Sequence, residues 1–146
     1  MLIRACVLAT ALMAGAVLTS ACGSGPTSPS TVATSVGTYT QTDLVVGSGA
    51  VATTGNRVTV AYTGWLYDTS RPDGKGTSFD ASTSFSFTIG SGQVIAGWEQ
   101  GVPGMRVGGL RRLILPPNLA YGNRSPGAGI PPNATLVFDI TLNSIQ

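Results

Sequence analysis

The sequence contains no histidine among its 146 residues, and only 10% of the residues are charged. Histidine is the commonest general base and the commonest metal ligand in proteins. Its absence therefore excludes Ser-His and Cys-His catalytic pairs and makes a metal site unexpected. The charged residues, eight Lys and Arg against six Asp and Glu, form no basic run. Nucleic-acid-binding proteins carry a clustered basic face, so we expect no nucleic-acid partner.

Side chains that could carry covalent or acid–base chemistry are also scarce. The only lysine, Lys75, is the only candidate base for an activated serine, and it falls in a predicted loop. The glycines form no GxxxxGK[ST] phosphate-binding pattern. The acidic residues are isolated from one another in the sequence: Asp43, Asp68, Asp73, Asp80, Glu99 and Asp139. Hydrolysis, phosphoryl transfer and redox chemistry therefore find little support, and we expect no cofactor.

Only two cysteines are present, and both lie within the first 22 residues. The chain opens with one positive charge, Arg4, followed by an apolar run over residues 7–18 and then small residues. This pattern is typical of a secretory signal peptide over residues 1–21, cleaved before Cys22. A membrane-spanning helix needs about 20 apolar residues, more than this run supplies. A buried N-terminal helix of the fold is the alternative.

The Ala21–Cys22 pair after the apolar run resembles the lipobox of bacterial lipoproteins, in which the cysteine is acylated. Thr19 stands where that motif usually has leucine, and Leu18 lies one residue further back. Cys22 is therefore a predicted lipidation site that would anchor the chain to a membrane. Residues 22–38, rich in Gly, Ser, Thr and Pro, predict a flexible tether. We expect an extracytoplasmic lipoprotein of the bacterial cell envelope, or alternatively a secreted or periplasmic soluble protein.

From residue 39 the sequence shows strand-like alternation, which predicts a folded domain over residues 39–146. Apolar residues at every second position indicate half-buried strands. The only predicted helix spans residues 95–102 and is ended by Pro103 and Gly104. The predicted class is α+β, a twisted antiparallel sheet of about five strands wrapped around one short helix. The predicted strands are residues 39–46, 58–63, 84–89, 110–115 and 135–143.

Three features of this domain point to a binding site. Gly64 interrupts the alternation, which indicates a bulge or a close approach of the backbone. The predicted loops at residues 68–78 and 118–133 are long, and long loops often carry binding sites. Aromatic residues lie beside them: Tyr62, Trp65, Phe79, Phe85, Phe87, Trp98, Tyr121 and Phe138.

One reaction needs nothing beyond an apolar cleft. Rotation about an X-Pro peptide bond has a barrier of about 18–20 kcal/mol, which amide resonance sets. The twisted transition state loses this resonance and with it much of the charge separation of the carbonyl group. An apolar aromatic pocket therefore suits the transition state better than water does. Because no proton transfer or nucleophile is required, a chain without histidine can catalyse this rotation.

Five blocks of the sequence occur in a familiar order. They are AYTGWLYD (61–68), SFDAS (78–82), FSFTIGSGQVIAGWEQGVPGMRVGG (85–109), RRLILPPNLAYG (111–122) and IPPNATLVFDITL (130–142). Together they closely resemble the FKBP-type peptidyl-prolyl cis-trans isomerases. The resemblance implies a half-wrapped antiparallel sheet, isomerisation of X-Pro bonds in folding proteins, and no cofactor. The implied partners are proline-containing polypeptides and, as inhibitors, macrolides such as rapamycin.

The resemblance also implies which residues form the pocket. The catalytic set is Tyr62, Phe79, Asp80, Trp98, Tyr121 and Phe138, and the substrate-binding set is Phe85, Val94, Ile95 and Ile130. Trp98 is expected to form the floor on which the proline ring lies, and Asp80 to accept a hydrogen bond from Tyr62 or from the ligand. The Ile95 N–H and the Tyr121 hydroxyl are expected to donate to carbonyl groups of the ligand. Phe87 and Leu136 fit the same pattern but are predicted to be core.

The rim of the pocket departs from the family's pattern at three places. Family members often have a histidine in the loop after the AYG motif, whereas the loop here, NRSPGAGIPP, has none. Gln93 stands where an acid is common, and the loop over residues 69–77 is longer than in the minimal domain.

Two other interpretations of the protein's function remain. One is a non-catalytic proline-peptide-binding chaperone or adhesion module, and the other is a structural β-domain of the cell envelope. Without a coiled-coil heptad, the chain is expected to be a monomer.

Overall fold

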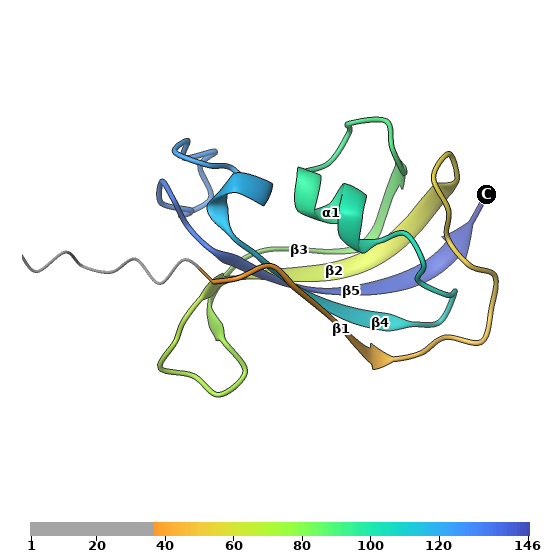
Figure 1. Cartoon of the computed structure of the whole chain (residues 1–146), viewed down its shortest axis with the longest axis horizontal. Coiled ribbons are helices and arrows are strands. Elements are labelled where there is room, and N and C mark those ends of the chain that lie inside the picture. Colours follow the sequence, from red (N-terminus) through yellow and green to blue (C-terminus); the bar gives the residue numbers. More distant parts are fainter. Residues whose placement is uncertain (1–36) are drawn as a thin grey trace, which may run out of the picture. The chain divides into compact units, whose positions relative to one another are not determined.

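Five strands form one antiparallel sheet in the computed structural model, which describes residues 37–146. They are β1 (Thr40–Val45), β2 (Arg57–Tyr67), β3 (Lys75–Thr88), β4 (Leu110–Leu115) and β5 (Leu136–Ile145), in the spatial order β1-β4-β5-β2-β3. The one α-helix of the described residues, α1 (Ala96–Gly101), lies over one face of this sheet (Figure 1). A 3-10 helix, η1 (Pro117–Leu119), follows β4. The predicted fold class is confirmed.

Strand β3 is longer than the sequence predicted. The alternation predicted a strand over residues 84–89 and a loop over 68–78, whereas β3 begins at Lys75. β3 is an edge strand that pairs with β2, and shifts of register interrupt that pairing. Residues 75–83 are all half-buried or exposed. Because neither side of this stretch is buried, it needs no apolar residue at every second position, and its periodicity gave no signal.

The hydrophobic core lies between α1 and the face of the sheet beneath it. Alternate residues of the three central strands point to this side and are at most 3% exposed: Val58, Val60, Leu113, Leu115, Leu136, Phe138, Ile140 and Leu142. Phe87 is also buried, as predicted for it and for Leu136. A strand with one buried face needs apolar side chains at every second position, so these elements could be read from the sequence.

Two glycines allow α1 to approach the sheet closely. Gly97 and Gly101 are four residues apart and therefore lie on the same side of the helix. A Cβ atom at Gly97 would lie 2.4 Å from Leu115 Cδ2, and one at Gly101 would lie 2.5 Å from Leu113 Cδ1. Both leucines are fully buried, and a close-packed core gives their methyl groups little room to move. The two glycines thus set the depth at which α1 sits over the sheet.

Replacing Gly97 with alanine is expected to lower the free energy of unfolding by about 2 kcal/mol, because the added methyl group overlaps Leu115 in a filled core. At an unobstructed helical position the same change stabilises by about 1 kcal/mol. Chemical denaturation measures the free energy of unfolding of G97A, and Gln100→Ala, at an exposed position of the same helix, serves as the control. A G97A protein as stable as the wild type would show that α1 does not need this glycine.

A buried arginine joins the end of α1 to strand β1. The Arg111 side chain is 5% exposed and donates two hydrogen bonds to the Asp43 carboxylate, from Nε to Oδ1 at 2.5 Å and from Nη2 to Oδ2 at 3.0 Å. Its Nη1 donates to the carbonyl oxygens of Gly101 and Pro103, at 2.8 and 3.2 Å. Arg111 thus satisfies carbonyl groups at the C-terminal end of the helix, where intrahelical partners run out.

The first residue that the structure describes is Gly37, whose N–H donates to Thr135 Oγ1 at 3.3 Å. The predicted signal peptide over residues 1–21, the predicted lipidation site Cys22 and the predicted tether up to residue 36 lie outside the described residues. Within residues 37–146, no helix is long and apolar enough to cross a membrane.

Candidate functional site

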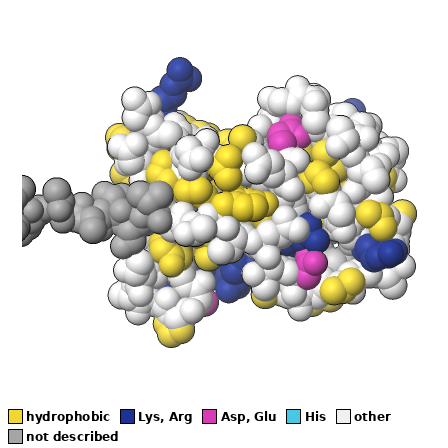
Figure 2. All heavy atoms as spheres, viewed as in Figure 1, with side chains coloured by type: hydrophobic (Ala, Val, Ile, Leu, Met, Phe, Trp, Pro, Cys, Tyr) yellow, Lys and Arg dark blue, Asp and Glu magenta, His cyan; other side chains and the backbone are white. Residues whose placement is uncertain are grey.

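A cavity of about 390 Å³ opens between α1, the loop before it and strands β2, β3 and β5. Its lining residues are Tyr62, Phe79, Asp80, Phe85, Gly92, Gln93, Val94, Ile95, Trp98, Tyr121 and Phe138. The structure therefore brings together all the predicted pocket residues except Ile130. Hydrophobic side chains also gather near the middle of the face that Figure 2 shows.

Ile130 does not line the cavity. It is 4% exposed and belongs to the hydrophobic core. Conversely, Gly92 lines the cavity although no site role was predicted for it, and Gln93, predicted at the rim of the pocket, lines it too. The only signal for Gly92 was its place in the loop directly before the predicted site residues Val94 and Ile95.

Two larger hollows, of about 570 and 610 Å³, lie elsewhere on the sheet. The first lies between the β2–β3 turn and residues 131–135, and the second lies around Trp65 and Asp139. Neither is walled by aromatic rings from more than one element. Ligand sites are mostly apolar with a few convergent polar groups, so the aromatic cavity is the candidate site.

Trp98 is the centre of a cluster of perpendicular aromatic rings. It is 4% exposed, and its ring centroid lies 5.0 Å from that of Tyr62 and 5.4 Å from that of Phe138, with interplanar angles of 82° and 90°. Phe85 lies 6.1 Å away, and Phe79 contacts Phe138 at 5.6 Å. Edge-to-face packing of this kind is favourable beyond the area it buries and fixes the rings in place. The cavity therefore has rigid apolar walls.

Gly64 of β2 makes room for two of these rings. A Cβ atom there would lie 2.7 Å from Phe79 Cζ and 2.8 Å from Phe138 Cε1. The pairing of β2 with β3 also shifts register between Gly64 and Trp65. The close approach that the sequence indicated is therefore present, and the strand pairing is irregular at the position where the alternation breaks. They allow rings from the neighbouring strands β3 and β5 to meet over β2.

A hydrogen bond from Tyr62 to Asp80 crosses one side of the cavity. The Tyr62 hydroxyl donates to Asp80 Oδ2 at 2.6 Å, and the Ala81 N–H donates to Asp80 Oδ1 at 2.9 Å. Burial, followed by this hydrogen bond and the charge of Asp80, raises the pKa of the Tyr62 phenol above its ordinary value. The phenol therefore stays protonated at neutral pH and holds the Asp80 carboxylate at the cavity wall.

Tyr121 and Ile95 also line the cavity. Tyr121 is 36% exposed, and burial together with the nearby Asp80 charge raises the pKa of its hydroxyl, which keeps it protonated as a donor. Ile95 directly precedes α1, and its carbonyl accepts hydrogen bonds from the N–H groups of Trp98 and Glu99 at 2.9 and 3.3 Å. The Tyr121 hydroxyl and the Ile95 N–H are thus polar groups beside aromatic and apolar side chains.

Within residues 37–146, no group of three or more Asp, Glu, Cys or His side chains is placed to hold a metal ion.

Comparisons with known proteins agree with this geometry. The sequence profile of the FKBP-type peptidyl-prolyl cis-trans isomerases matches residues 48–143. The chain is 44% identical over 100 residues to the FK506-binding protein of Neisseria meningitidis serogroup A, covering 68% of this chain and 89% of that protein. It is 48% identical over 101 residues to the FK506-binding protein of Streptomyces anulatus, covering 66% and 77%. The crystal structure of AtFKBP13 is similar with a TM-score of 0.62 at 37% identity, covering 74% of this chain and 93% of that one.

The fold and the cavity define a class of protein, in which a half-wrapped antiparallel sheet holds an aromatic-walled cavity against one short helix. With the family match over residues 48–143, the chain belongs to the FKBP-type peptidyl-prolyl cis-trans isomerases. Membership indicates peptidyl-prolyl cis-trans isomerase activity, so the interpretation as a purely structural β-domain is wrong.

Proposed function

We propose that the protein accelerates rotation about X-Pro bonds during the folding of extracytoplasmic proteins, by enclosing the proline in its aromatic cavity. The observation that carries this proposal is the buried Trp98, ringed by perpendicular aromatic side chains beneath an open cavity. Uncatalysed rotation takes about 10–100 s and can limit folding. An isomerase that needs no energy source suits a compartment outside the cytoplasm.

The mechanism follows from the amide bond itself. The planar amide is stabilised by resonance, which places partial charge on the carbonyl oxygen and on the nitrogen. The twisted state has less charge separation, so moving it from water into apolar walls penalises it less than the planar state. Trp98 supports the proline ring from below, and the apolar parts of Tyr62, Phe79 and Phe138 exclude water around it. The cavity thus stabilises the transition state relative to the bound ground state.

The polar groups at the cavity position the peptide. The Ile95 N–H and the Tyr121 hydroxyl donate to carbonyl groups of the bound peptide, and Asp80 fixes the Tyr62 ring. Phe85 and Val94 form an apolar rim that contacts the residues next to proline in the bound peptide. Ile130 supports the fold from within the core and is not proposed as a contact.

The variants Asp80→Ala and Tyr121→Phe are expected to lower kcat/KM for an Xaa-Pro peptide by about tenfold, the equivalent of one well-placed hydrogen bond. Peptide affinity is expected to change less, because these groups align the peptide for rotation rather than supply most of the contact. Kinetic measurement of cis-to-trans rotation, with affinity from Trp fluorescence, separates the two. Equal losses of turnover and affinity would count against this mechanism.

Activity is expected to be nearly independent of pH between about pH 6 and pH 9. The chain has no histidine to titrate in this range, and the raised pKa values of Tyr62 and Tyr121 keep both phenols protonated throughout it. The rate constant measured in several buffers at constant ionic strength tests this. A sigmoidal profile centred near neutrality would mean that a titrating group takes part in the rotation.

The same cavity is proposed to bind macrolides. The bacterial relatives are named FK506-binding proteins, and FK506 and rapamycin are expected to occupy the cavity in competition with the peptide. The floor and walls that this requires, Trp98, Tyr62 and Phe138, stand together here. Inhibition by rapamycin, competitive with peptide, is the expected result.

The proposed location follows from the sequence of the leader. Removal of residues 1–21 and acylation of Cys22 would leave the isomerase domain as a tethered monomer on the outer side of a membrane. Mass spectrometry of the mature N-terminus and fractionation of a Cys22→Ser variant test this. A soluble, non-acylated wild-type chain would favour ordinary secretion instead, and sedimentation of the soluble form tests the monomer.

A further inference from the structure

The loop between β3 and α1 forms one wall of the cavity. Four of its residues, Gly92 to Ile95, line the cavity, and Ile95 is the residue proposed to donate its N–H to the peptide. Gly90 and Gly92 have φ angles of 84° and 71°, so the loop turns through conformations that only glycine adopts easily. The position of the Ile95 N–H therefore depends on what holds this loop.

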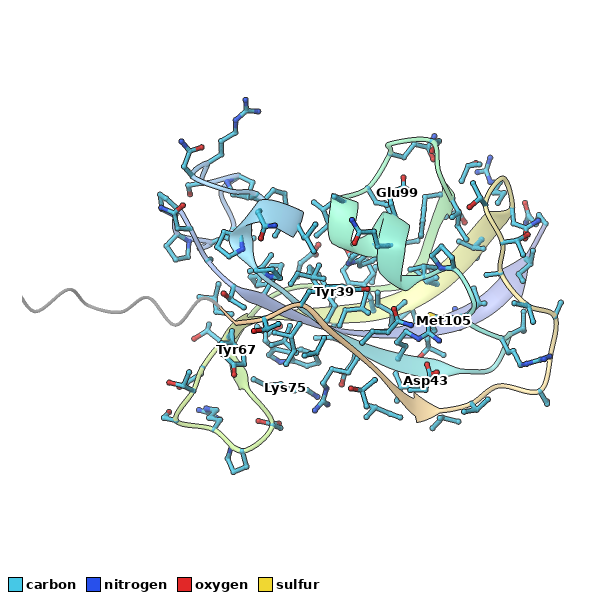
Figure 3. All side chains as sticks on the ribbon, in the orientation of Figure 1. Tyr39, Asp43, Tyr67, Lys75, Glu99 and Met105 are labelled. Atoms are coloured by element: carbon cyan, nitrogen blue, oxygen red, sulfur yellow. The ribbon has the colours of Figure 1, made fainter. Side chains whose placement is uncertain are left out.

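The Glu99 carboxylate holds this loop. Its Oε2 accepts a hydrogen bond from the Gly90 N–H and its Oε1 accepts one from the Gly92 N–H at 2.9 Å. Figure 3 shows Glu99 on α1, facing the loop that precedes the helix. Charge-assisted hydrogen bonds to a carboxylate are stronger than those between neutral groups. One side chain thus satisfies two backbone donors of a segment whose sequence contains no apolar anchor before Val94.

Glu99 also belongs to the same helical turn as the cavity floor. It follows Trp98 directly, and the N–H groups of both residues donate to the Ile95 carbonyl oxygen. Ile95 is therefore fixed from the helix through its carbonyl group and, through the loop, by the Glu99 carboxylate. A second brace closes the other end of the loop, where Gln93 Oε1 accepts a hydrogen bond from the Thr88 N–H at 2.9 Å.

We infer that Glu99 is a positioning residue for the isomerase: it holds the Gly90–Ile95 loop so that the cavity wall and the Ile95 N–H are in place before the peptide binds. The inference rests on the proposed function of the cavity. Glu99 itself does not line the cavity, and it acts through the loop. A binding wall that is already ordered avoids the entropy that ordering it on binding would cost.

Three variants of the full chain test this inference. Glu99→Ala removes both acceptors, Glu99→Gln keeps the shape and one acceptor oxygen, and Gln100→Ala changes the exposed neighbour in the same helix. For an Xaa-Pro peptide, E99A is expected to raise KM by about tenfold, because loss of a preformed binding wall weakens ground-state and transition-state binding alike. The kcat value of E99A is expected to change by less than about twofold. The KM of E99Q is expected to lie between those of E99A and the wild type, and Q100A is expected to match the wild type.

Amide hydrogen exchange supplies the readout that a merely structural role would not give. In E99A the Gly90 and Gly92 N–H groups are expected to exchange faster, while core amides such as that of Leu113 keep their protection. An unchanged KM in E99A would overturn the inference, as would a rise in KM that Q100A shares. If E99A does not fold, E99Q decides: a wild-type KM with unchanged Gly90 and Gly92 exchange refutes it. An inactive wild-type chain would instead refute the proposed function.

Discussion

Replacing Trp98 with leucine is expected to lower kcat/KM by about 100-fold, since the cavity loses the apolar contact of one large buried side chain. The indole is the floor of the cavity and contacts Tyr62, Phe85, Phe87 and Phe138. Leucine would leave a void beneath the proline and would release the surrounding rings from their perpendicular packing. The measurement is the catalysed rate of cis-to-trans rotation of an Xaa-Pro peptide.

Two further variants keep this result interpretable. Trp98→Phe preserves an aromatic floor and removes the Nε1 atom, which is buried and without a partner within the described residues. Removing an unpaired buried donor offsets part of the packing loss, so W98F is expected to stay folded with an intermediate rate. Trp65, the only other tryptophan, lies outside this cavity with Lys75 Nζ 4.1 Å from its ring. Trp65→Leu is expected to keep wild-type kinetics, and an equal loss in W65L would contradict the assignment of Trp98 as the floor.

Replacing Asp43 with alanine is expected to lower the free energy of unfolding by about 2 kcal/mol, less than for a fully buried pair because Asp43 is partly exposed. The substitution leaves the Arg111 guanidinium buried with one hydrogen-bonding edge unpaired, next to the end of α1. Urea denaturation of D43A, with Thr42→Ala on the same exposed strand as the matched control, measures the loss. A D43A protein as stable as T42A would show that Arg111 is held by the helix carbonyl groups alone.

The same pair predicts how stability depends on acidity. The hydrogen bonds from Arg111 lower the pKa of the Asp43 carboxyl below its ordinary value. A lowered pKa in the folded state contributes stability above the unfolded-state pKa, at about pH 4, and this contribution is lost as pH falls through the folded-state value. The wild type is therefore expected to lose more stability than D43A below about pH 4. Part of the acid sensitivity remains in D43A because Asp139, though partly buried, is also held at a lowered pKa by hydrogen bonds from Arg112 and Lys75.

The central strands could be predicted from the sequence, whereas half of β3 could not. Residues such as Val58, Val60 and Ile140 alternate with more exposed ones because one face of their strand is buried in the hydrophobic core. The first part of β3 carries Lys75, Thr77 and Ser78 at a sheet edge, with neither side buried, so no periodicity marked it. The close contact of α1 with the sheet could not be predicted from the sequence either. The need for glycine at positions 97 and 101 follows from the positions of Leu115 and Leu113, which only the structure shows.

The pocket could be predicted largely through resemblance rather than periodicity. The motifs named the aromatic residues, and the structure gathers them around one cavity, with Trp98 in contact with Tyr62. Ile130 belongs to the same motifs but lies in the core. It was predicted wrongly because sequence order does not say which side of a loop faces the cavity. The role of Glu99 had no sequence signal, since its two partners are backbone N–H groups, which every non-proline residue carries.

The most direct test of the account is the rate of cis-to-trans rotation of a fluorogenic Xaa-Pro peptide, measured with the purified protein in the presence and absence of rapamycin. The account predicts a rate above the spontaneous one that rises with enzyme concentration and returns to the spontaneous value when rapamycin saturates the cavity. A protein shown to be folded by circular dichroism that binds the peptide without accelerating its rotation would contradict the account and identify a non-catalytic binding module.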